Sequence, residues 1–146
     1  MKFTVEITIN LSRDRVITLF DSTENLYKWQ PGLVSFEHES GTPREVGAKS
    51  RLEYKMGKRE IKMVETITVK NFPDKFSAIY EAKGVWNEVK NYFHEVDENT
   101  TKWVGENEFR CSGFMKLFAI LLPGSFKKET MKYFKYFKEF AEKEGK

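Results

Sequence analysis

Cysteine and histidine are scarce in this chain. Its 146 residues include one cysteine, Cys111, and two histidines, His38 and His94. A lone cysteine cannot form an internal disulfide, which favours a reducing compartment, and we expect Cys111 to be inert. The absence of HExxH, HxxxH and cysteine-rich spacings argues against a metal site, and so few histidines argue against a nucleophilic triad. We therefore expect no metal and no cofactor.

Long apolar runs and signal segments are also missing. The longest apolar stretch, residues 117–123, is far shorter than the roughly 20 residues that a membrane-spanning helix needs. Residues 1–5 run directly into an alternating pattern, without the apolar segment of a signal peptide. A formal net charge of +3 is too small to indicate nucleic-acid binding. These absences predict a cytoplasmic protein that does not insert stably into membranes.

Aromatic residues, in contrast, are plentiful. They make up 15% of the chain, and phenylalanine alone accounts for 13 residues. Phenylalanine builds cores and also lines apolar cavities. The length suits one domain with a sizeable core, so we expect residues 1–146 to form a single domain.

Alternation of apolar and polar residues predicts seven β-strands. In residues 3–11, the apolar Phe3, Val5 and Ile7 alternate with polar residues, which predicts a strand with one buried face. Six similar segments follow, at residues 33–40, 48–56, 60–70, 75–83, 85–96 and 101–111. Short turns separate them, which indicates an antiparallel meander.

Helical patterns flank the meander. Before it, Ser12 is expected to cap one short helix and Asp21 a second, in a capping box. After it come a short apolar segment at residues 114–122 and an amphipathic helix at residues 125–143, with Ser125 as its expected cap. The expected fold is α+β: a curved seven-stranded antiparallel sheet wrapped around a long C-terminal helix, with two short helices between strands 1 and 2.

This order of elements predicts a ligand cavity, because a curved sheet crossed by one helix cannot fill its own centre. Side chains alternate across a strand, so strand parity and the apolar helix face together assign the lining. The predicted lining consists of Phe36, Leu52, Tyr54, Met63, Glu65, Phe76, Tyr80, Asn87, Val89, Asn91, Trp103, Asn107, Phe126, Thr130, Tyr133, Phe134 and Phe137. Val34 and His38 are expected to share the inward face of their strand with Phe36.

Glu65 is the strongest candidate for chemistry. Apolar residues flank it on the same strand face, and desolvation there should raise the pKa of Glu65 and fit it for proton transfer near neutral pH. Tyr54 or Tyr80 would act beside it as a hydrogen-bond donor. In the alternative, Glu65 pairs with an arginine such as Arg51, or a bulge turns it toward solvent.

Other candidates have structural alternatives as well. The asparagines could bond the sheet backbone or buried water, and the tyrosines could be core residues with solvated hydroxyls. Residues 114–122 could be a packed connector, a lid, or a patch that touches a membrane or a partner. The lysines of the last helix are expected to form a solvated face.

Several short segments carry a resemblance to a known superfamily. They are Ser12-Arg13-Asp14-Arg15-Val16, Tyr27-Lys28-Trp29-Gln30-Pro31, Gly47, Thr101-Lys102-Trp103-Val104-Gly105-Glu106-Asn107-Glu108-Phe109, Gly113-Phe114-Met115-Lys116 and Pro123-Gly124-Ser125-Phe126-Lys127-Lys128. Together with the order of elements, they resemble the helix-grip fold of the START/SRPBCC (Bet v 1-like) superfamily. The chain looks most like the bacterial polyketide cyclase/dehydrase and lipid transport group.

The resemblance implies a hydrophobic cavity between the sheet and the C-terminal helix. It implies no shared catalytic signature that could be transferred to this sequence. In such folds, loops near one end of the long helix gate the entrance. The loop at residues 41–47 and the segment at residues 114–122 match these gates.

The sequence leaves three functions open. The first is a binding or carrier protein for a small hydrophobic ligand such as a lipid, an isoprenoid or a polyketide-like molecule. The second is a cofactor-independent cyclase or dehydratase that uses Glu65 as general acid or base, with Tyr54 or Tyr80. The third is an interaction module that acts through its surface, with transient membrane or partner contact at residues 114–122. A monomer or weak dimer is expected in each case.

Overall fold

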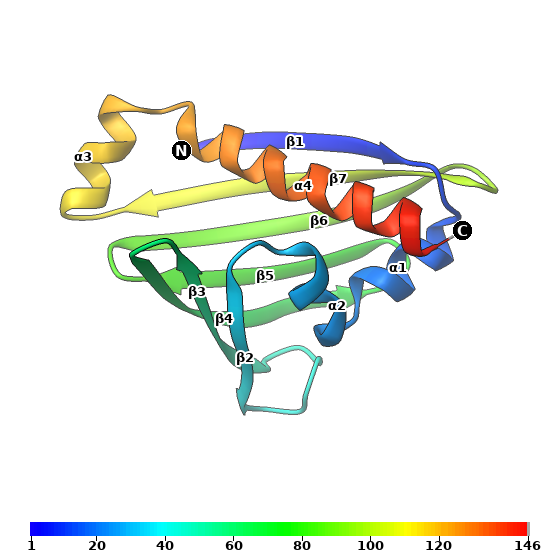
Figure 1. The fold of residues 1–146 in the computed structure, drawn as a ribbon, viewed down its shortest axis with the longest axis horizontal. Coiled ribbons are helices and arrows are strands. Elements are labelled where there is room, and N and C mark those ends of the chain that lie inside the picture. Colours follow the sequence, from blue (N-terminus) through cyan, green and yellow to red (C-terminus); the bar gives the residue numbers. More distant parts are fainter. Residues whose placement is uncertain (146) are drawn as a thin grey trace.

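The computed structural model describes residues 1–145, which form seven strands and four helices. In chain order these are β1 (Lys2–Ile9), α1 (Arg13–Phe20), α2 (Thr23–Trp29), β2 (Leu33–Ser40), β3 (Lys49–Met56), β4 (Arg59–Asn71), β5 (Lys75–Ala82), β6 (Val85–Asp97), β7 (Thr100–Cys111), α3 (Phe114–Leu121) and α4 (Ser125–Glu144). The strands form one antiparallel sheet in the order β1-β7-β6-β5-β4-β3-β2. Figure 1 shows the long α4 running beside β1 and β7, with α1 and α2 near its C-terminal end. The predicted α+β helix-grip architecture is confirmed.

Strand parity separates a buried face of the sheet from an outer face. On β7, Thr101, Trp103 and Asn107 are all buried, whereas Glu106 between them is exposed. The same alternation holds on β3, where Ser50 and Leu52 are buried and Arg51 is exposed. The period-2 pattern in the sequence therefore predicted these faces correctly.

An aromatic cluster fills the space between the C-terminal half of α4 and the sheet. The rings of Trp103 and Phe134 stack with centroids 3.6 Å apart. Phe137 meets Trp103 edge-on at 5.3 Å, and Phe20 from α1 meets Phe137 at 5.9 Å. Gly105 makes this approach possible, since a Cβ atom there would lie 2.6 Å from Phe134 Cζ. This half of the interior is a packed core.

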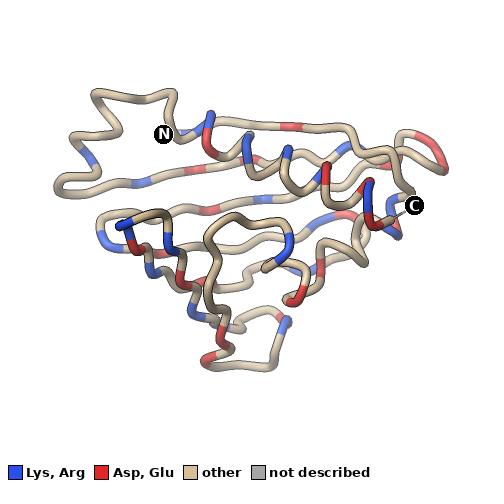
Figure 2. The backbone as a smooth tube through the Cα atoms, in the orientation of Figure 1, with Lys and Arg blue, Asp and Glu red and all other residues tan. Residues whose placement is uncertain are grey.

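Two polar contacts fasten the C-terminal part of α4 to the end of β1. Lys138 Nζ donates to the carbonyl oxygen of Thr8. The backbone N–H of Asn10 donates to Glu142 Oε2 at 2.8 Å. Figure 2 shows that basic residues recur along the length of α4. The helix is thus held on the sheet by its apolar face and, near its C-terminal end, by the charged side chains of Lys138 and Glu142.

Two of the expected helix caps are wrong. The N-cap of α2 is Ser22, whose side chain accepts from the N–H of Asn25, whereas Asp21 is the C-cap of α1. The N-cap of α4 is Gly124, with no side-chain hydrogen bond, and Ser125 is the first helical residue. The cap at Ser12 is confirmed, because its hydroxyl accepts from the N–H of Arg15. In α2 the cap lies one residue later because the Asp21 carboxylate is engaged in ion pairs.

The inward face of β2 also differs from the prediction at two positions. Val34 is 47% exposed, and the preceding Leu33 is the buried residue. A register shift between Leu33 and Ser35 changes the parity at this point. Phe36 is partly buried, and His38 is exposed. Of the three residues predicted to face inward on β2, only Phe36 therefore does so, together with Leu33 at the start of the strand.

The helix α3 stands apart from the core. It contains no buried residue, although seven of its eight residues are apolar. None of the helices in residues 1–145 is both long enough and apolar enough to cross a membrane.

Candidate functional site

A row of polar side chains crosses the buried face of the sheet on adjacent strands. Ser50 of β3 is paired with Glu65 of β4, which is paired with Tyr80 of β5. Tyr80 is paired in turn with Asn87 of β6. Directly opposed residues of antiparallel strands point to the same face, so these four side chains lie side by side. This polar row is the best candidate for ligand recognition or chemistry.

Glu65 is the centre of the polar row. It is 5% exposed, and Tyr80 donates its hydroxyl hydrogen to Glu65 Oε2 at 2.8 Å. Arg44 Nη1 donates to Glu65 Oε1 at 3.4 Å. Burial raises the pKa of Glu65, and this effect outweighs the Arg44 charge and the Tyr80 hydrogen bond, which lower it. The carboxyl group can therefore hold a proton at a higher pH than a solvated glutamate.

The cationic partner of Glu65 is Arg44, not Arg51. Arg44 belongs to the loop between β2 and β3 and has a backbone φ of 64°, in the left-handed region. Its guanidinium also binds Asp21 at 3.0 Å, while Lys70 Nζ holds its backbone oxygen at 2.9 Å. Arg51 instead pairs with Glu39 on the surface. The loop predicted as a gate is thus fixed by an ion-pair network that reaches the polar row.

The two candidate tyrosines have different partners. Tyr54 donates its hydroxyl to Gln30 Oε1 at 2.6 Å, and burial, the largest cause, raises its pKa. Burial and the neighbouring Glu65 raise the pKa of Tyr80 well above 10.0. The structure therefore joins Tyr80 directly to Glu65, and it places Tyr54 in a separate hydrogen bond.

The three candidate asparagines have hydrogen-bond partners within the protein. Asn91 Oδ1 accepts from the indole N–H of Trp103 at 2.9 Å. Asn87 Nδ2 donates to the carbonyl of Glu108 at 3.1 Å, and Asn107 Nδ2 donates to the carbonyl of Gly105 at 3.3 Å. Asn87 Nδ2 also donates to the carbonyl of Glu88 at 3.5 Å. Bonding within the sheet thus accounts for each asparagine.

The predicted lining residues divide into two groups by burial. One group is packed into the core or fully covered: Leu52, Tyr54, Glu65, Phe76, Asn91, Trp103, Asn107, Phe134 and Phe137. The other is partly exposed: Phe36, Met63, Tyr80, Asn87, Val89, Phe126, Thr130 and Tyr133. The second group comes from β2, β4, β5 and β6 and from the N-terminal half of α4. At Tyr133, burial raises the pKa to about 12.

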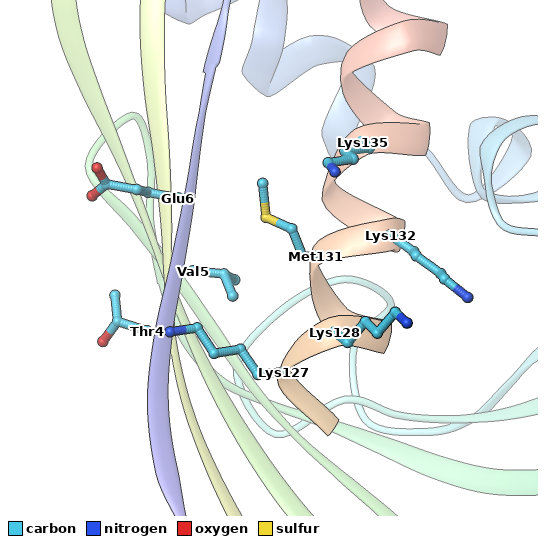
Figure 3. Close-up of a pocket in the computed structure, with 8 residues that line it drawn as sticks. All are labelled: Thr4, Val5, Glu6, Lys127, Lys128, Met131, Lys132 and Lys135. Carbon is cyan, nitrogen blue, oxygen red and sulfur yellow. The ribbon is translucent and has the colours of Figure 1, made fainter. Parts of the chain in front are cut away.

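A separate groove of about 440 Å³ lies on the other side of α4, between this helix and β1. Its lining consists of Thr4, Val5, Glu6, Lys127, Lys128, Met131, Lys132 and Lys135. In Figure 3, Val5 and Met131 point toward each other across the groove, and Lys127 extends toward β1. The groove is therefore basic with a small apolar floor, and none of the predicted cavity residues lines it.

Sequence patterns did not identify three polar groups near the interior. Arg44 and Gln30 lie in loop positions, and their contacts with Glu65 and Tyr54 depend on the fold. The indole N–H of Trp29 is buried without a hydrogen-bond acceptor among the described residues. An unpaired buried donor has a free-energy cost that a ligand or water oxygen would relieve.

Solved structures with the same fold support the topology. A conserved protein from Geobacillus kaustophilus superposes with a TM-score of 0.82 at 14% identity, covering 98% of this chain and 96% of that chain. The Zhui aromatase/cyclase from a Streptomyces species superposes with a TM-score of 0.80 at 11% identity, covering 100% of this chain and 96% of that chain. Ara h 8.0201 superposes with a TM-score of 0.75 at 13% identity, covering 97% of both chains.

No model of a known protein family matches the sequence, and no curated protein is significantly similar to it. At the identities of these three structures, the comparison establishes the fold alone. The chain has the Bet v 1-like helix-grip fold that the sequence predicted.

Proposed function

We propose that this chain, with its helix-grip fold, is a binding or carrier protein for a small hydrophobic ligand. The site is the space between the N-terminal half of α4 and the middle of the sheet. The observation that carries the proposal is the incomplete burial of Phe126, Thr130 and Tyr133, which belong to the inward face of α4. On the sheet, Val89 and Tyr80 are partly exposed as well. An apolar ligand would cover these surfaces.

The polar row suggests the chemistry of the ligand. The row holds a buried carboxyl group, Glu65, with the polar side chains of Ser50 and Tyr80 directly beside it and Asn87 next in line. A suitable ligand has an apolar body and one oxygen-bearing end that exchanges hydrogen bonds with this row. Lipids, isoprenoids and polyketide-like molecules all have this character.

Blocking the space with a large side chain tests the proposal. Val89→Trp should reduce the affinity for a fluorescent fatty-acid analogue by about tenfold or more, because the indole occupies the ligand space. Thr130→Phe, on the facing helix, should act in the same way. The matched control is Val34→Trp, since Val34 is exposed on β2. Thermal unfolding would establish that each variant is folded.

Equal affinities for Val89→Trp, Thr130→Phe and Val34→Trp would overturn the proposed site. Organic extraction of the purified protein, followed by mass spectrometry, gives a second measurement. It should recover an apolar molecule from the wild type and less of it from Val89→Trp.

A cyclase or dehydratase activity is the second candidate. It is favoured by the hydrogen bond from Tyr80 to the buried Glu65 and by the raised pKa of this carboxyl group. In its protonated form, Glu65 would donate a proton to a substrate oxygen, and its carboxylate would take one back. The similarity to an aromatase/cyclase of 11% identity adds only the fold.

Glu65→Gln separates the two candidates. Gln keeps the acceptor oxygen for Tyr80 but cannot transfer protons, so an enzyme would lose turnover and retain ligand binding. A carrier would return its ligand chemically unchanged from both the wild type and the variant. Product formation from a polyketide-like substrate that disappears in Glu65→Gln would favour the enzyme.

A further inference from the structure

The helix α3 presents an apolar surface that the fold leaves uncovered. Phe114 is 77% exposed, Ile120 66% and Leu121 67%, while Leu117 and Leu122 are each about half exposed. Lys116 is the only charged residue of this helix. Isolated exposed apolar residues are ordinary, but contiguous ones on one short helix mark an interaction surface.

The opposite face of α3 holds the helix on the body of the protein. Phe118 meets Phe126 of α4 edge-on at 5.9 Å, and Phe126 contacts Phe109 of β7 at 4.7 Å. Met115 lies against the turn at Gly84. One face of the helix is therefore anchored, so the exposed face is presented in a defined orientation. Figure 1 shows α3 at one extremity of the molecule, beyond the start of α4.

Positive charge is concentrated next to this apolar face. Residues 114–128 contain three lysines and no acidic residue, a net charge of +3, which equals the formal charge of the whole chain. The remaining residues therefore carry no net charge. Lys127 and Lys128 follow shortly after Leu122, and Lys132 and Lys135 continue the series along the groove between α4 and β1.

We propose that the exposed face of α3 and the lysines of the first half of α4 form a docking surface for an anionic lipid membrane. In this arrangement Phe114, Leu117 and Ile120 enter the boundary between headgroups and acyl chains, while Lys127 and Lys128 bind anionic headgroups. Such interfacial binding needs both contributions, since either alone is weak and reversible. Charge complementarity favours a lipid surface over a second copy of this chain, because a second copy would bring the same lysines into contact.

The docking surface is separate from the proposed ligand space and does not depend on it. The exposed α3 residues point away from the body, whereas the polar row lies inside it. Failure of membrane binding would leave the ligand proposal standing, and the reverse is also true.

Vesicle flotation with the full chain tests the docking surface. The wild type should bind phosphatidylcholine vesicles that contain about a third phosphatidylserine, and it should bind pure phosphatidylcholine at least about tenfold less. Raising the salt from about 0.05 to about 0.5 M should release most of the bound protein, because screening weakens the lysine contribution.

Two double variants address the two halves of the surface. Leu117→Ser with Ile120→Ser, and Lys128→Glu with Lys132→Glu, should each reduce the bound fraction by about tenfold. All four positions are exposed, so the fold should persist. The matched controls are Val34→Ser with Val46→Ser and Lys58→Glu with Lys62→Glu, which alter exposed residues elsewhere.

Three results would overturn the proposal. They are no flotation of the wild type with anionic vesicles, equal losses in the controls, and concentration-dependent dimerisation by light scattering that Leu117→Ser with Ile120→Ser abolishes. The last result would show instead that α3 is a contact between copies.

Discussion

Opposing effects act on the pKa of Glu65. Desolvation favours its neutral form, whereas Arg44 and the Tyr80 hydroxyl favour the carboxylate. The net effect is a pKa above the ordinary glutamate value of 4.5. The proton affinity of Glu65 therefore depends first on its burial, and then on Tyr80 and on the loop that carries Arg44.

The raised pKa predicts a specific pH dependence of stability. Between about 4.5 and its folded-state pKa, Glu65 binds more protons in the folded than in the unfolded protein. Its contribution to the free energy of unfolding therefore falls as the pH rises through that range. Glu65→Gln removes this loss, so the stability of the variant relative to the wild type should increase with pH. Urea unfolding at a series of pH values measures the difference.

The matched control for this experiment is Glu37→Gln, at an exposed position of β2. It should follow the pH profile of the wild type. A difference between Glu65→Gln and the wild type that stays constant with pH, or that shrinks as the pH rises, would contradict the assignment.

Gly105 is required by the close approach of α4 to the sheet. A methyl group there would lie 2.6 Å from Phe134 Cζ, and Trp103 blocks any retreat of that ring. Gly105→Ala should lower the free energy of unfolding by about 1–3 kcal/mol through overpacking. Gly124→Ala is the control, because nothing lies within 4 Å of its added methyl group. Equal stabilities of the two variants, measured by urea unfolding, would show that Phe134 moves freely.

At the scale of elements, Ser22 and Ser125, which lie at the starts of α2 and α4, have different roles. Ser22 accepts a hydrogen bond from the N–H of Asn25 at 3.2 Å, whereas Ser125 makes no cap hydrogen bond in α4. Ser22→Ala should cost about 1 kcal/mol of stability, and Ser125→Ala should cost close to nothing. Thermal unfolding of both variants checks this, and an equal cost would refute the cap assignment.

The helix caps also show which features the sequence pattern alone cannot predict. Ser, Asp and Asn all accept hydrogen bonds at a helix start, so Asp21 and Ser22 are equivalent candidates locally. Tertiary contacts decide between them, because Arg44 and Lys70 both pair with the Asp21 carboxylate. Alternation, in contrast, needs no tertiary information, and it placed the strands and the buried faces of β3 and β7 correctly.

On the scale of the whole molecule, the core is unevenly distributed. The main cluster joins β1, β4, β5, β6 and β7 to α1, α2 and α4, whereas Leu33, Leu52 and Tyr54 form a small second cluster on β2 and β3. Native-state hydrogen exchange should therefore show smaller opening free energies for the amides of β2 and β3 than for those of β6 and β7. Identical values across the sheet would indicate one cooperative unit.

Much of the fold was predictable from the sequence, but only part of the candidate site was. Parity placed Glu65 and Tyr80 on the same face, and the register makes them neighbours. The contact between Arg44 and Glu65 spans 21 positions and depends on a left-handed residue in a loop, which no periodic pattern reveals. Whether Phe134 and Phe137 line a cavity or fill the core depends on packing volumes, and they fill it.

The anchoring of α4 has a consequence for assembly. An edge strand such as β1 offers its outward backbone groups to any extended chain, which is the usual origin of fibril growth. Here Lys138 engages the carbonyl of Thr8, and Glu142 engages the amide of Asn10. These side chains shut the final stretch of that edge to an incoming strand. The same two residues that clamp the longest helix thus also keep the C-terminal end of the β1 edge from pairing with another strand.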